Sequence, residues 1–261
     1  MLIVVSPAKS LDYESKVATR KFTQPTMLDR SRQLVDVMAT KTPDELSAIM
    51  SISSDLALLN HERFQDWEPP FTRKNSRPAL LAFNGDTYTG LDAAATFGER
   101  DYTHAQKVLR ILSGLYGVLR PLDLIQPYRL EMGSVVENPG GRNLYEFWGG
   151  TITDSLNRDL AASPGAAVLV NLASSEYFGA VEGDRIDGAV ITPKFLDRPL
   201  NDASGELRMM GFHAKRARGA MAGWIIRNRV KSTRALRDFD GLGYEFDPAR
   251  SSAAGPVFTR T

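Results

Sequence analysis

Residues 2–9 read LIVVSPAK, four apolar residues followed at once by a polar segment. A short apolar run that ends at a turn signal predicts a strand buried on both faces. The same pattern predicts further buried strands at 79–83, 167–172 and 190–195. Helical patterns lie between these strands, so we expect an α/β (α+β) fold, a single domain over 1–261 with a mixed sheet flanked by helices.

The remaining elements are expected from periodicity and from capping residues. Helices are predicted at 26–39, 101–112 and 143–161, and at the start of the basic segment near 215. A turn is predicted at 201–205, and short strands are predicted at 128–132, 206–212, 243–246 and 256–260.

Thr42 to Asn60 is predicted to form two helices joined by a tight hairpin. Thr42-Pro43-Asp44-Glu45 is a strong helix start, with a cap and a capping box. The layout is similar to a helix-hairpin-helix, which holds DNA phosphates on hairpin amides. That motif has two hairpin glycines, whereas this chain has Ser51 and Ser53. An ordinary helical hairpin that packs on the core is the alternative.

The composition excludes several classes of function. The 261 residues include no cysteine and only three histidines, His61, His104 and His213, which rules out disulfides and thiolate chemistry and argues against a metal centre. The longest uncharged run is too polar to span a bilayer, and no basic region precedes the first apolar run. We therefore expect a cytoplasmic protein with no metal, no cofactor and no membrane contact.

The charge of the chain is unevenly distributed. The formal net charge is +1, yet eight of the 32 basic residues fall between Lys215 and Arg237, where no acidic residue occurs. The rest of the chain has 24 basic and 31 acidic residues, a net charge of −7. A basic segment on an acidic body predicts an anion-binding surface. A solvated helix paired with carboxylates elsewhere is the alternative.

Several predicted strands end in polar segments that contain a basic residue. Lys9, Lys194, Lys215 and Arg216 would line one cleft if these ends meet, because ligand sites gather at strand ends in parallel sheets. Each could equally be a solvated side chain.

Small residues interrupt the basic helix at Gly219, Ala222 and Gly223. Glycine in a helix costs about 1 kcal/mol relative to alanine, so these positions need an explanation. They would allow either the close approach of a polyanion or close packing against another helix.

Signals for an enzyme are few. The chain has no phosphate-binding glycine loop and no nucleophile-elbow serine. Ser6 with Lys9 could form a Ser/Lys dyad, and a desolvated Lys9 could form a Schiff base. His213 beside Lys215 is a candidate general base, although a structural role is favoured.

Several long runs resemble the YaaA family of bacterial peroxide-stress proteins. The matching runs are LIVVSPAKSLDY at 2–13, LAFNGDTYTGL at 81–91, LSGLYGVLRPLDLIQPYRLEMG at 112–133, LYEFWG at 144–149, VNLASSEYF at 170–178 and AKRARGAMAGWII at 214–226. The resemblance covers nearly the whole chain.

The resemblance implies protection against hydrogen peroxide, linked with lowered free iron and DNA repair. It implies a family-specific α/β fold with a helix-hairpin-helix element and a positively charged cleft that binds DNA without sequence preference. No obligate protein partner is implied. The candidate phosphate-binding residues are Ser6, Lys9, Arg129, Lys194, Lys215, Arg216, Arg218 and Arg227, with Ser51 and Ser53 in the hairpin. A nucleic-acid- or nucleotide-processing enzyme, with Lys9 as nucleophile or phosphate ligand, is the alternative.

Overall fold

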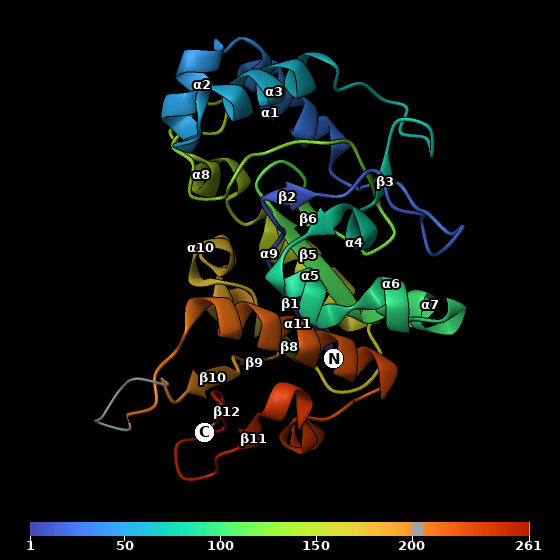
Figure 1. The fold of residues 1–261 in the computed structure, drawn as a ribbon, viewed down its shortest axis with the longest axis vertical. Coiled ribbons are helices and arrows are strands. Elements are labelled where there is room, and N and C mark those ends of the chain that lie inside the picture. Colours follow the sequence, from blue (N-terminus) through green and yellow to red (C-terminus); the bar gives the residue numbers. More distant parts are fainter. Residues whose placement is uncertain (200–205, 261) are drawn as a thin grey trace.

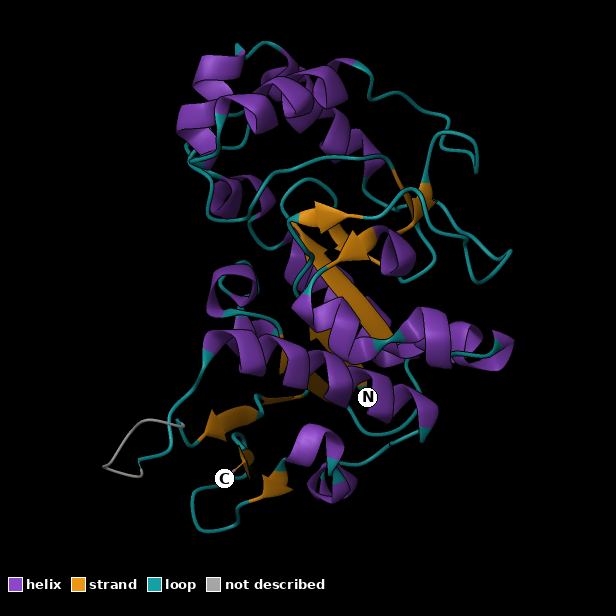
Figure 2. Cartoon of the chain, viewed as in Figure 1, coloured by secondary structure: helices purple, strands orange, loops and turns teal. Residues whose placement is uncertain are grey.

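The computed structural model describes residues 1–199 and 206–260, which are built on a central five-stranded sheet (Figures 1 and 2). In the order β6-β5-β1-β8-β9, its strands are Gly117–Leu119, Leu109–Ser113, Leu2–Val5, Val168–Leu172 and Ala189–Ile191. The central strand β1 is parallel to both β5 and β8. β9 is parallel to β8, whereas β6 is antiparallel to β5. The expected α/β class with a mixed sheet is confirmed.

Three smaller sheets surround the central one. β2 (Ser10–Leu11) pairs with β4 (Phe83–Asn84), β3 (Arg77–Pro78) pairs with β7 (Leu124–Ile125), and β12 (Val257–Arg260) lies between β10 (Lys194–Asp197) and β11 (Glu245–Phe246). The two strands expected near the C-terminus are therefore present, and they form a sheet of their own with β10.

Helices cover the sheet and extend the molecule at one end. They are α1 (Leu28–Ala39), α2 (Pro43–Met50), α3 (Ser54–Gln65), α4 (Ala79–Ala82), α5 (Asp86–Leu91), α6 (Ala93–Thr96), α7 (Glu99–Val108), α8 (Leu144–Trp148), α9 (Thr151–Ala162), α10 (Ser175–Phe178) and α11 (Gly211–Arg227). Helices α1, α2, α3 and α8 gather at one end, and α11 runs across the middle, where it contacts β1 and β8 (Figure 1).

Two predicted boundaries in the first half of the chain are wrong. Residues 79–83 are not a strand, because Ala79–Ala82 form the short helix α4 and only Phe83 enters β4. A short apolar run buried on all sides does not distinguish a helix from a strand. The helix expected at 101–112 ends at Val108, since Leu109 begins the fully buried β5 beside β1.

Four further predictions need correction in the second half. The helix expected at 143–161 is two helices, α8 and α9, because Gly149 and Gly150 separate them. Residues 128–132 form an irregular segment rather than a strand. The strand expected at 190–195 is two strands, β9 and β10, because Thr192-Pro193 separates them and directs β10 into the other sheet. In the stretch 206–212, Arg208 forms only an isolated bridge and α11 already begins at Gly211. The turn expected at 201–205 lies outside the described residues.

The glycines of α11 are explained by helix packing. An added Cβ on Gly219 would lie 1.7 Å from the Thr87 backbone oxygen of α5, and one on Gly223 would lie 2.7 Å from that of Leu91. Both glycines are buried. The interpretation of these positions as an approach surface for a polyanion is therefore wrong, because α5 occupies that face of the helix.

The helical hairpin α2–α3 forms as predicted. The Thr42 side chain accepts from the Glu45 amide while Glu45 accepts from the Thr42 amide, which completes the capping box. Ser51 ends α2 in the left-handed region with φ of 50°, and Ser53 caps α3 through the Leu56 amide. That this hairpin acts as a DNA-binding motif stays a prediction.

Half-buried His104 on α7 makes the stability of the fold dependent on pH. Burial, and then the positive charges of Arg229, Lys107 and Lys231, lower the pKa of His104 from 6.5. The unfolded chain then binds a proton more tightly than the folded chain, so stability is complete above about pH 6.5 and falls as the pH drops toward the folded pKa. His104→Gln should reduce the loss of melting temperature between about pH 7.5 and pH 5.5. Equal losses in both proteins would contradict this assignment.

Candidate functional site

The parallel strands β1 and β8 end side by side at the centre of the sheet. The chain places β5 on one side of β1 and β8 on the other, so the gap beyond β1 and β8 is a topological switch point, where open α/β sheets bind ligands. Ser6 follows β1 directly, and Ser174 lies two residues after β8. The Ser6 Oγ accepts the Ser174 amide at 2.9 Å, and the two hydroxyls are 3.3 Å apart. These bonds fix the two strand ends relative to each other.

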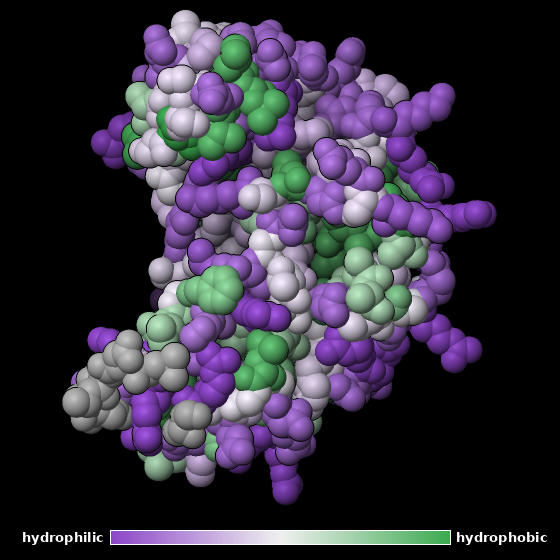
Figure 3. Space-filling model, viewed as in Figure 1, coloured by the Kyte–Doolittle hydropathy of each residue, from purple (hydrophilic) through white to green (hydrophobic). Residues whose placement is uncertain are grey.

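A cavity of about 310 Å³ opens at this point and is called the switch-point pocket below. It is lined by residues 6–10, 84–87, 128–131, Leu172, Ser174, Glu176, Tyr177, Lys215 and Arg218. Figure 3 shows the molecule hollowed between the end that carries α1–α3 and the region of α11. The pocket thus combines strand ends, an irregular loop and one face of the basic helix.

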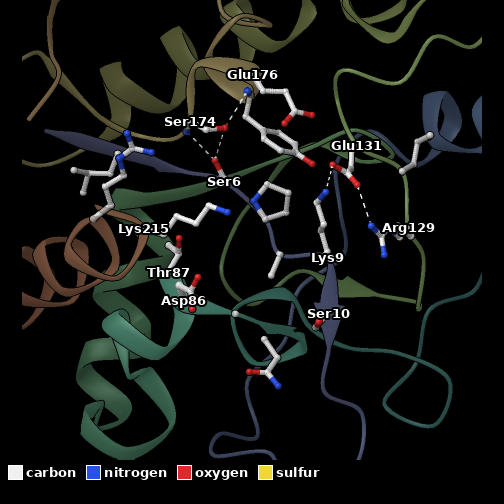
Figure 4. Close-up of a pocket in the computed structure, with 18 of the residues that line it drawn as sticks. Ser6, Lys9, Ser10, Asp86, Thr87, Arg129, Glu131, Ser174, Glu176 and Lys215 are labelled. Carbon is white, nitrogen blue, oxygen red and sulfur yellow. Dashed lines mark hydrogen bonds and ion pairs between the residues drawn. The ribbon is translucent and has the colours of Figure 1, made fainter. Parts of the chain in front are cut away.

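Four basic residues from distant parts of the chain line the pocket. Lys9 comes from the segment after β1, Arg129 from the loop after β7, and Lys215 and Arg218 from α11. Figure 4 shows Lys215 entering from the side opposite Lys9 and Arg129. Of the four basic residues expected at strand ends, Lys9 and Lys215 line the pocket, whereas Lys194 and Arg216 do not. Arg129 and Arg218, which are candidates from the family resemblance, line it as well.

Glu131 neutralises one side of the pocket. Its carboxylate binds the Lys9 Nζ at 2.8 Å and the Arg129 Nη2 at 3.3 Å (Figure 4). The side chain of Lys9 is 61% exposed, whereas those of Glu131 and Arg129 are mostly buried. One carboxylate is thus shared by two cations, and Glu176, a second carboxylate of the lining, accepts the Gly133 amide at 3.0 Å.

The α11 side of the pocket supplies two cations that form no ion pair with a carboxylate of the described residues. Within residues 1–199 and 206–260, no carboxylate lies within ion-pair distance of Lys215 or Arg218. Lys215 is exposed, and an Arg218 Nη2 lies 3.9 Å from the Met209 sulfur. Burial lowers the pKa of Arg218, but a guanidinium stays charged at neutral pH. These two cations are therefore available to an anionic ligand.

Other predicted phosphate-binding residues lie elsewhere. Lys194 is exposed at the start of β10, because Pro193 turns the chain away from β9. Arg216 is exposed on another face of α11 from Lys215, and the Arg227 guanidinium donates to the Thr96 hydroxyl at 3.0 Å. Ser51 and Ser53 lie in the α2–α3 hairpin. None of these residues lines the switch-point pocket.

The candidate catalytic groups are engaged in structural contacts. The Ser6 hydroxyl is paired with Ser174 and the Lys9 ammonium with Glu131, so the two groups do not form the Ser/Lys dyad that the sequence allowed. The exposure of Lys9 also removes the desolvation that a Schiff-base lysine requires. His213 Nδ1 lies 3.4 Å from a buried carboxylate oxygen of Asp197, consistent with its favoured structural role.

Three acidic residues of the described chain line the pocket, Asp86, Glu131 and Glu176, and none of them was identified from the sequence as a site residue. Glu131 follows Arg129 by two positions, a local signal that an ion pair could form. Asp86 begins α5 and is half-buried in the pocket wall, and no hydrogen bond or ion pair of its carboxylate is found within the described ranges. The sequence signal that could have pointed to Asp86 as a site residue is its position in the turn after Asn84.

Two negative findings concern the described part of the chain. No group of three or more His, Asp and Glu side chains there is placed to hold a metal ion. No helix there is both long and apolar enough to cross a membrane.

Comparison with known proteins places the chain in a family. The family model of the peroxide stress protein YaaA matches residues 1–250. The chain belongs to the YaaA family. A UPF0246 protein of Cellvibrio japonicus is 52% identical over 260 residues, and one of Idiomarina loihiensis is 53% identical over 260. Each alignment covers 100% of this chain and 98% of the relative. The resemblance to YaaA-family peroxide-stress proteins that the sequence motifs indicated is therefore confirmed over nearly the whole chain.

Proposed function

We propose that this YaaA-family protein binds DNA through the phosphate backbone, with little sequence preference, and that this binding serves DNA protection or repair in the peroxide stress response. One observation carries the proposal: Lys215 and Arg218 reach the pocket without a carboxylate partner in the described residues. Cations that are not already neutralised release the counterions of a bound polyanion, which is the main source of sequence-independent affinity for DNA.

The surroundings of these two cations favour a large polyanion over an isolated anion. Arg216 is exposed on the same helix, and α11 borders the hollow seen in Figure 3. Phosphates along a DNA strand could therefore contact several cations in turn. Contacts of this kind position the duplex without reading its bases, so the proposal predicts similar affinities for unrelated sequences.

The salt dependence of binding tests the proposal. Fluorescence anisotropy with labelled duplexes of equal length and unrelated sequence should give similar dissociation constants. The logarithm of the affinity should fall linearly with the logarithm of salt concentration, by roughly 0.9 for each contacted phosphate. An affinity that does not change with salt would overturn the proposed mechanism.

Glu131→Gln should strengthen DNA binding. The substitution removes the carboxylate that holds Lys9 and Arg129, so both cations become available to phosphates. One additional phosphate contact corresponds to roughly an eightfold gain in affinity at about 0.1 M salt, together with a steeper salt dependence.

The control for this prediction is Glu14→Gln, which removes one negative charge from an exposed loop that does not line the pocket. It should leave the affinity almost unchanged. If both variants bind equally tightly, overall charge rather than the pocket controls binding, and the role given to Glu131 is wrong.

A further inference from the structure

We propose that the switch-point pocket binds a single nucleotide unit, with its phosphate on Lys215 and Arg218 and its base against the aromatic wall opposite. The inference rests on the proposed DNA binding and names the part of the ligand that enters the pocket. A cavity of about 310 Å³ is at the small end of small-molecule sites and cannot admit a duplex.

The walls of the pocket suit a nucleobase. Tyr128, Leu130, Leu172 and Tyr177 line it and are each at most 8% exposed, so they form a rigid apolar surface. The Tyr128 hydroxyl is fixed by Ser113 at 2.6 Å, and its ring packs against Phe83 and Tyr116, so this part of the wall is held in place. Proteins that take a base out of DNA hold it between aromatic and apolar side chains of this kind.

The charges in the pocket are arranged for a ligand with an anionic end and a hydrogen-bonding end. Lys215 and Arg218 supply the cationic side, while Asp86 supplies an acceptor with no partner in the described residues. Figure 4 shows Asp86 beside Thr87, on the same side of the pocket as Lys215. A carboxylate repels a phosphate but accepts hydrogen bonds from a base amino group. Inorganic phosphate alone would leave this acceptor unused.

An exposed aromatic residue stands next to the cationic side. Phe212 lies one helical turn before Lys215 and is 58% exposed, and Met209, which contacts Arg218, is 54% exposed. Large apolar side chains beside a basic surface are the wedges that proteins insert between base steps to open a duplex. Phe212 is therefore placed to displace a base that the pocket then receives.

Binding of free nucleotides is the first test. Isothermal titration calorimetry with deoxyadenosine monophosphate, deoxyadenosine and inorganic phosphate should show the tightest binding for the monophosphate. Asp86→Ala should weaken monophosphate binding by about tenfold or more, because it removes a hydrogen bond to a charged group. Asp86→Asn, which keeps the shape of the side chain, separates this loss from local damage to α5 and should retain part of the affinity.

Binding of a base that is part of a DNA duplex is the second test. A duplex that carries one unpaired 2-aminopurine should change its fluorescence on binding, and Phe212→Ala should abolish the change while leaving free-nucleotide binding intact. A fluorescence change without free-nucleotide binding would also support the pocket, if Asp86→Ala removes it.

The outcomes separate the two proposals. If the duplex binds but neither calorimetry nor 2-aminopurine fluorescence shows a nucleotide in the pocket, the pocket inference is overturned and DNA binding stands. If the monophosphate binds but duplex DNA does not, the proposed function is overturned and the pocket stands. Phosphate that binds as tightly as the monophosphate would overturn the assignment of a nucleotide.

Discussion

Replacing Lys215 and Arg218 together by glutamine should lower the affinity for duplex DNA by about 60-fold at roughly 0.1 M salt. Each cation is counted as one ion pair with DNA phosphate, because neither has a carboxylate partner in the described chain. The slope of affinity against salt, both on logarithmic scales, should become shallower by about 1.8. The loss should be the same for unrelated sequences, since a phosphate contact does not read the base.

The chain offers a matched control for this double variant. Arg73 and Lys74 are exposed in the loop between α3 and β3 and do not line the pocket. Arg73→Gln with Lys74→Gln removes the same two charges, so the overall field of the protein changes equally. If this control loses as much affinity as the pocket variant, DNA binds by general charge and the pocket does not hold it.

The position of the pocket could be predicted from the sequence because strand ends are local signals. LIVVSPAK places Ser6 and Lys9 after a buried strand, and the topology of parallel strands brings such ends together. The basic composition of α11 identified Lys215 and Arg218 as candidates, but it identified Arg216 and Arg227 equally, and these two do not line the pocket. For Ser6 and Lys9, local pattern and long-range arrangement agree.

The composition of the pocket could not be predicted where it depends on the path of irregular chain. Glu131 lies in a segment without periodicity, so no local sequence signal shows that its carboxylate contacts Lys9, which is 122 positions earlier in the chain. Lys194 was predicted to line the pocket and does not, because Pro193 separates β9 from β10 and Lys194 lies in the sheet of β10. The sign of the charge on a site therefore depends on contacts that periodicity does not encode.

The glycines of α11 show the same limit at the level of a single helix. Small residues in a helix indicate that another group approaches the backbone closely, but they do not identify that group. A helix, a ligand and a nucleic acid each require the absence of a Cβ. The position of α5 identifies this neighbour. Gly219 and Gly223 therefore serve helix packing rather than ligand binding, and the energy of this packing can be measured.

Gly219→Ala should destabilise the protein by about 3 kcal/mol, the upper part of the usual range for overpacking. The new Cβ would lie 1.7 Å from the Thr87 oxygen and 2.9 Å from the Leu91 amide nitrogen, which are backbone atoms and cannot rotate away. The gain in helix propensity of about 1 kcal/mol does not offset this clash. At roughly 2 °C or more per kcal/mol, the melting temperature should fall by about 6 °C or more.

Gly211→Ala in the same helix provides the opposite expectation. An added Cβ there meets no atom within 4 Å, so only the propensity changes and the free energy of unfolding should rise by up to about 1 kcal/mol. Calorimetric melting of both variants compares one chemical change in two surroundings. If Gly219→Ala melts as high as Gly211→Ala, α5 does not lie against α11 as described. Asp86 and Thr87 of α5 would then not form this wall of the pocket.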